Sequence, residues 1–130
     1  MNSEKKWKSY ITSDSNIPQR IQNMIIREYY NDNNIPFSLS ATELNGCNNI
    51  VLETITEDSH NFDAVILYSI NSLPNSVKKS KDICEKILNN GTELHFAYEK
   101  IVIKDPDNIQ QIEDIVLTKK IAMEGQNVRS

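Results

Sequence analysis

The chain has 130 residues, of which 38% are hydrophobic and 25% are charged, a balance typical of one folded domain. Its 18 acidic residues outnumber its 14 basic residues, which gives a formal net charge of -4 and disfavours a nucleic-acid-binding surface, since such surfaces are basic. No segment approaches the roughly 18 apolar residues of a membrane span, so we expect a cytoplasmic protein with no membrane partner. We expect a single domain over residues 1–130, with flexible ends at 1–6 and 126–130.

The first elements in chain order are a short strand and a helix. Residues 8–12 carry the apolar and aromatic side chains of a strand. Asn16 stands three residues before Gln19 in a capping-box pattern, and Pro18 suits a first helical turn. A helix is therefore expected from this point to about Tyr30.

The next stretch predicts a second strand, a loop and a second helix. Side chains alternate between apolar and polar over 37–41, and a loop over 42–46 is expected at the carboxyl end of that strand. Val51, Leu52 and Ile55 then share the buried face of a helix.

The third strand is expected within residues 62–70, a nearly unbroken apolar run that ends in polar residues. A third helix follows from Val77, and Gly91 suits its carboxyl cap. Residues 94–98 predict a fourth strand, and 101–103 a short edge strand.

Strands that alternate with helices predict an α/β fold: a three-layer sandwich with a mainly parallel sheet of four to five strands, because helical crossovers join parallel neighbours. Open sheets of this kind bind ligands at the carboxyl ends of their strands. Nine polar or aromatic residues near these ends are the candidate ligand-binding residues: Ser13, Gln19, Arg20, Asn23, Ser40, Thr42, Tyr68, Ser69 and Asn71. Arg20, beside the exposed backbone N–H groups of a first helical turn, would suit a phosphate or carboxylate. Serine, threonine and asparagine are also ordinary turn residues, and that alternative stays open.

Three titratable residues are candidates for proton transfer: Glu43, His95 and Glu99. Glu43 is placed as a general base, and His95 would need a carboxylate such as Glu99 or Glu43 to orient it. A half-buried structural role for His95 is the alternative. Cys47 and Cys84 form no C-x-x-C pair, and no nucleotide-binding, hydrolase or zinc-protease motif is present, so we expect no metal and no cofactor.

Between Tyr10 and Glu99 the chain resembles the catalytic domain of serine recombinases (resolvases). The matching blocks are Tyr10–Ser13 with Gln22, Ile70–Ser76, and Gly91–His95. The resemblance implies a resolvase-like fold. Ser72 and Asn75 stand where that family has two arginines that stabilise the phosphodiester transition state, so we expect that Ser13 does not cut DNA.

A closer resemblance, over Tyr10 to Lys119, is to a small family called sporadic carbohydrate cluster proteins. The blocks are Pro18–Asn23, Leu39–Glu43, Leu94–Glu99 and Ile112–Ile115. This resemblance implies a place among the products of bacterial genes for surface polysaccharides, and it supplies no reaction.

Three functional hypotheses follow. The first is a small protein that binds or modifies a sugar or nucleotide sugar at the polar crevice. The second is a non-catalytic accessory protein for another pathway enzyme. It rests on a last helix that opens at Asp105 and Pro106, whose apolar stripe predicts a homodimer through residues 106–123. The third, a degenerate recombinase that still binds DNA, is disfavoured by the acidic composition.

Overall fold

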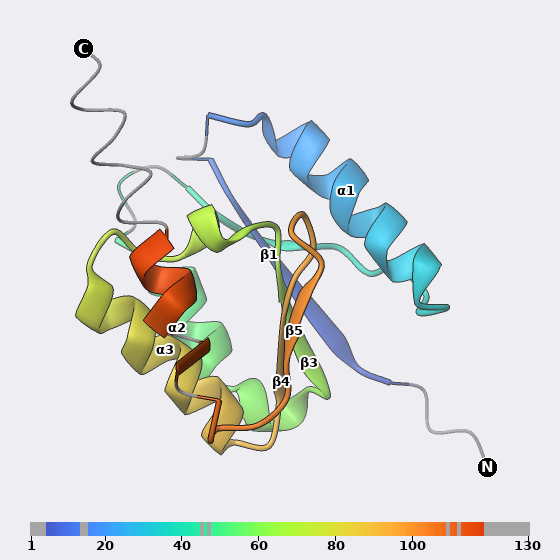
Figure 1. Cartoon of the computed structure of the whole chain (residues 1–130). Coiled ribbons are helices and arrows are strands. Elements are labelled where there is room, and N and C mark those ends of the chain that lie inside the picture. The colour runs from blue at the N-terminus through green and yellow to red at the C-terminus, as the bar shows by residue number, and fades with distance from the viewer. Residues whose placement is uncertain are drawn as a thin grey trace.

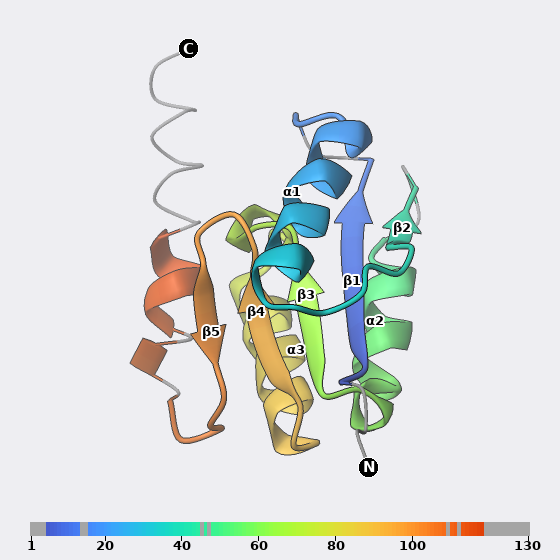
Figure 2. The same ribbon diagram turned by 90° about the vertical axis from the view of Figure 1, so that its right-hand side faces the viewer.

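The computed structural model describes residues 5–13, 16–44, 46, 48–108, 110–111 and 113–118. The sheet lies between helix α1 on one face and helices α2 and α3 on the other, as Figures 1 and 2 show. The strands are β1 (Trp7–Thr12), β2 (Ala41–Glu43), β3 (Ala64–Leu67), β4 (Glu93–Phe96) and β5 (Ile101–Ile103), and the helices are α1 (Gln19–Asp32), α2 (Ile50–Glu57) and α3 (Val77–Asn89). The predicted α/β fold class is confirmed.

The strand order in the sheet is β2-β1-β3-β4-β5. The pairs β1–β2, β1–β3 and β3–β4 are parallel, and β5 is antiparallel to β4. After β1 the chain first adds β2 on one side of it. After β2 the chain returns and adds β3 on the other side of β1. Crossovers through helices explain the parallel pairs, and the tight turn over 97–100 explains the antiparallel edge.

Each face of the sheet has its own apolar cluster. Trp7 and Ile11 of β1 pack with Ile66 of β3 beneath α1. Tyr10 of β1 packs with Val65 of β3 on the opposite face, which α2 and α3 cover. Because side chains alternate along a strand and both faces are covered, β3 needs apolar residues at every position.

The helical residues 110–111 and 113–118 lie on the α2 and α3 side of the sheet (Figure 1). Ile115 and Val116 are buried there in the core of their own chain, and Leu117 is 53% exposed. The helix expected from Pro106 begins later, because residues 106–107 form a turn in which Asp105 Oδ1 accepts a hydrogen bond from the Asp107 N–H at 2.9 Å. The other expected apolar positions, 109, 112, 121 and 123, are outside the described residues.

The second strand and the start of α1 differ from the prediction. The strand covers Ala41–Glu43 instead of 37–41, because the Phe37 ring packs on Tyr30 of α1, at a centroid distance of 5.4 Å, before the chain reaches the sheet. The N-cap residue of α1 is Pro18, and no side chain of the described residues makes a capping hydrogen bond there, so the expected capping box is not formed. No helix among the described residues is long and apolar enough to cross a membrane.

Candidate functional site at the carboxyl edge of the sheet

The carboxyl ends of β1 and β3 are neighbours at the point where the strand order reverses. Tyr68, which follows β3, donates its N–H to the Tyr10 carbonyl of β1 at 3.3 Å. The chain after β1 forms α1 on one face, whereas the chain after β3 forms α3 on the other (Figure 1). Open α/β sheets bind ligands outside the carboxyl ends of their strands at a reversal of this kind.

The buried side chain of Gln22 connects α1 to the end of β1. Its Oε1 accepts from the Thr12 N–H at 3.2 Å, and its Nε2 donates to the carbonyls of Thr12 and Ile17 at 2.8 and 2.7 Å. These bonds hold the first turn of α1 beside Ser13. Ser13 is oriented in turn by the Glu43 carbonyl, which accepts from its N–H at 2.9 Å and from its Oγ at 3.1 Å.

The first turn of α1 has a positive character. Gln19 and Arg20 are exposed, and no acidic residue lies in this turn. One turn further, Asn23 Oδ1 is buried and has no hydrogen-bond partner among the described residues. An exposed guanidinium beside a helix amino terminus suits an anionic ligand group.

The ends of β3 and β4 bring Ser69 and Glu99 together, as expected of parallel neighbours. Ser69 Oγ donates to Glu99 Oε2 at 2.6 Å, and the Ile70 N–H approaches Oε1 at 3.2 Å. Ser69 Oγ also accepts from the Asn71 N–H at 3.1 Å. The Glu99 carboxylate therefore fixes the turn that follows β3.

Two tyrosines lie beside this carboxylate. The ring of Tyr98 is 5.9 Å from that of Tyr68, centroid to centroid. Tyr68 is buried, whereas Tyr98, in the turn after β4, is 61% exposed. Tyr98 is not among the nine predicted ligand-binding residues.

Glu43 does not belong to this site, which corrects its placement as a general base. Its carboxylate is 1% exposed and accepts hydrogen bonds from the Tyr10 hydroxyl at 3.0 Å and from the N–H groups of Val51 and Leu52, both at 3.1 Å. It therefore caps α2, on the face of the sheet opposite α1. Arg20 and Glu43 lie on different faces and do not share a site.

His95 also lies away from the crevice. It is in register with Ile66 inside the sheet, beneath α1, and is 4% exposed. Its Nδ1 is 2.7 Å from the Tyr29 hydroxyl and its Nε2 is 2.8 Å from Glu93 Oε1. Burial lowers the pKa of His95 despite the opposing effect of Glu93, so the ring is neutral, with Nε2–H donating to Glu93 and Nδ1 accepting from Tyr29.

His95 therefore has the environment of a structural residue, which was the alternative to a catalytic role. The carboxylate that orients it is Glu93, two residues earlier on the same face of β4, and not Glu99 or Glu43. That i, i+2 spacing in a strand was the available signal in the sequence.

Ser40 and Thr42 are likewise separated from the reversal. Ser40 Oγ pairs with Ser9 Oγ at 2.8 Å, and Thr42 lies in β2, opposite Ile11 on the outer side of β1. The predicted residues that lie on the connections after β1, β3 and β4 are Ser13, Gln19, Arg20, Asn23, Tyr68, Ser69, Asn71 and Glu99.

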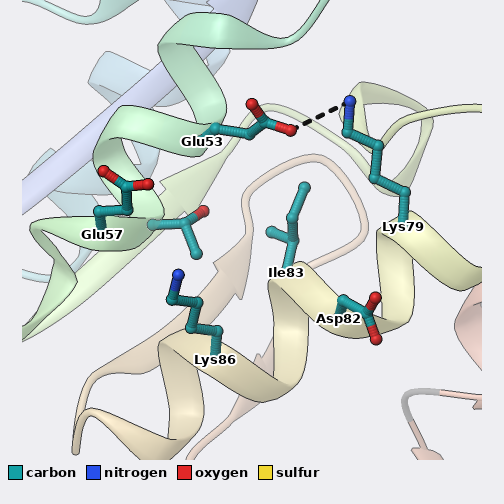
Figure 3. A pocket seen from close by; sticks show the side chains of 7 residues that line it. Glu53, Glu57, Lys79, Asp82, Ile83 and Lys86 are labelled. Atoms are coloured by element: carbon teal, nitrogen blue, oxygen red, sulfur yellow. Dashed lines mark ion pairs between the residues drawn. The ribbon is translucent and has the colours of Figure 1, made fainter.

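A charged groove of about 360 Å³ lies elsewhere, between α2 and α3 (Figure 3). Lys79 of α3 pairs with Glu53 of α2 at 3.1 Å, and Lys86 reaches from α3 toward α2 at the end where Glu57 lies. Because acids on one helix face lysines on the other, we interpret this groove as a contact between helices and not as a ligand site.

The fold is similar to that of a solved structure, the N-terminal catalytic domain of TP901-1 integrase. The TM-score is 0.68 at 17% sequence identity, over 92% of this chain and 98% of that one. The resolvase-like fold is therefore confirmed. No protein-family model and no curated protein matches the chain. Membership of the sporadic carbohydrate cluster family stays a prediction.

Proposed function

We propose that this is a cytoplasmic protein of bacterial surface-carbohydrate biosynthesis that binds a sugar phosphate or nucleotide sugar at the reversal between β1 and β3. The observation that carries the proposal is the strand order β2-β1-β3, which brings two polar strand ends together beside the first turn of α1. Ligands of open α/β sheets bind at such a reversal.

The phosphate end of the ligand lies at the first turn of α1. Arg20 is exposed there, and the backbone N–H groups of a first helical turn favour negative charge. Ser13 and Asn23 flank this turn and supply a hydroxyl and an amide. Gln22 keeps the whole arrangement fixed before a ligand arrives, which lowers the entropy cost of binding.

The sugar end lies toward the turn after β4. The Glu99 carboxylate, already oriented by Ser69, has lone pairs that accept hydrogen bonds from sugar hydroxyls. The exposed ring of Tyr98 supplies an apolar surface next to it. The sequence resemblance to carbohydrate cluster proteins supports the choice of a sugar.

We propose binding without a reaction on DNA. Ser72 is buried and Asn75 is exposed, and neither supplies the positive charge that the recombinase resemblance would require at these positions. Glu43 and His95, two of the three candidates for proton transfer, are buried and hold structural hydrogen bonds away from the reversal. We therefore propose a binding role within the pathway.

The test is a thermal-shift and calorimetric screen against sugar phosphates and nucleotide sugars. A ligand present at about 100 times its dissociation constant stabilises the folded state by about 2.7 kcal/mol, which is readily visible as a rise in Tm. Arg20→Gln should abolish most of that rise. Lys86→Gln, which removes the same charge from the distant α2–α3 groove, should leave it unchanged. Equal losses in both variants, or no rise with any such ligand, would contradict the proposal.

A further inference from the structure

A groove on the outer side of α1 has no part in the proposed ligand site. It has a volume of about 600 Å³ and lies between the helix and the segment that follows it. The helix contributes Met24, Arg27, Glu28 and Asn31, and the segment Ile35–Phe37 forms the other wall.

The groove is held open by contacts within its walls. The Phe37 ring packs edge-on against Tyr30 of the α1 core, and the Arg27 guanidinium lies 4.9 Å from the centre of the same ring. Met24 projects from the other wall and is 59% exposed. A preformed surface that combines exposed apolar residues with a polar rim is typical of a protein interface.

The adjacent opposite charges of Arg27 and Glu28 can pair with the same two residues of a second copy. Along α1, the apolar Met24 is followed by the adjacent opposite charges of Arg27 and Glu28 and then by Asn31. The apolar segment Ile35–Phe37 comes after the end of the helix. An antiparallel helix from another copy, related by an axis between positions 27 and 28, places each Arg27 against the other copy's Glu28. Met24, three residues before Arg27, then meets Asn31, three residues after Glu28.

We propose that a second copy of this chain occupies the groove and forms a two-fold homodimer through α1. Met24 of each copy packs against the other copy's α1 beside Asn31, at the helical wall of the groove, and two reciprocal ion pairs fix the register. Closed two-fold dimers are the commonest soluble oligomers and require this kind of self-complementary patch. The last helix is less suited, because Ile115 and Val116 are already buried within their own chain.

The test is sedimentation equilibrium on the full chain at about 1 to 100 μM, a range that resolves micromolar dimers. We expect a dimer whose dissociation constant rises at least about tenfold in Met24→Glu, because a buried anchor is lost. Leu117→Glu, on the last helix, is the matched control and should dissociate as the original chain does. Thermal melts of each variant verify that it is folded.

Charge reversal provides the sharper measurement. Glu28→Arg leaves the Arg27–Phe37 contact in place but opposes two cations across the axis, so it should weaken the dimer. A monomer at every concentration overturns the proposal. So does a dimer that Met24→Glu leaves intact, or a Glu28→Arg variant that dimerises as tightly as the original chain.

Discussion

The side-chain amide of Gln22 binds both backbone polar groups of Thr12, the last residue of β1, with its Oε1 3.2 Å from the N–H and its Nε2 2.8 Å from the carbonyl. An amide side chain thereby continues the backbone ladder beyond the end of the strand. The position of α1, and of Arg20 within it, depends on this relationship.

Gln22→Ala removes three hydrogen bonds from a buried position. We expect a loss of about 2 to 4 kcal/mol in the free energy of unfolding, because buried backbone groups lose their partner. Gln19→Ala, at an exposed position of the same helix, should cost less than about 0.5 kcal/mol. Urea denaturation measures both values. A small loss in Gln22→Ala would show that the bonds do not hold the helix.

Glu43→Ala removes the carboxylate that caps α2 and binds Tyr10. The expected loss in the free energy of unfolding is about 2 to 4 kcal/mol, because the Tyr10 hydroxyl and two N–H groups at the start of α2 lose their acceptor. Glu53→Ala, on the exposed side of the same helix, is the control and should cost about 1 kcal/mol or less. If Glu43 were instead a catalytic base, its removal would leave stability nearly unchanged.

Because His95 is buried, we expect the free energy of unfolding to depend on pH. Burial lowers the pKa of His95 below 6.5 in the folded state, so the unfolded chain binds more protons at mildly acidic pH. The stabilisation is complete above pH 6.5 and is lost as the pH falls through this value toward the folded pKa. An NMR titration of the ring protons should give a pKa below 6.5. A value above 6.5 would contradict the assignment, and His60→Gln identifies the signal of the other histidine.

We expect the Cys84 thiol not to react in the folded protein. It is buried in the core of the α2–α3 face, and burial raises its pKa to about 12. In a Cys47→Ser background, a thiol reagent should modify Cys84 at the rate of unfolding, and adding urea should accelerate the reaction. Immediate labelling in native buffer would show that this face is open.

Hydrophobic patterning predicted most of the fold, because the buried strands and helices have periodic apolar residues. It misplaced β2, since the alternation over 37–41 reflects the packing of Phe37 on α1 and not a strand. The carboxylates were harder to assign. Glu43 and Glu99 both follow strands in the sequence, but only the packed structure shows that Glu43 faces α2 and that Glu99 faces Ser69.

Gln22 shows a second limit of sequence analysis. It belongs to a block that resembles the recombinases, yet a glutamine on a helix predicts a solvated residue by composition alone. Its role depends on the backbone polar groups of Thr12, which Gln22 reaches only because α1 packs beside the end of β1.

The central claim is that ligands bind at the reversal between β1 and β3. The most direct test is amide chemical-shift mapping with a nucleotide sugar added to the labelled protein. The account predicts shifts that saturate at Ser13, Arg20 and Ser69, with no change at Lys86 in the groove between α2 and α3. Saturating shifts confined to that groove, with none at the reversal, would contradict it.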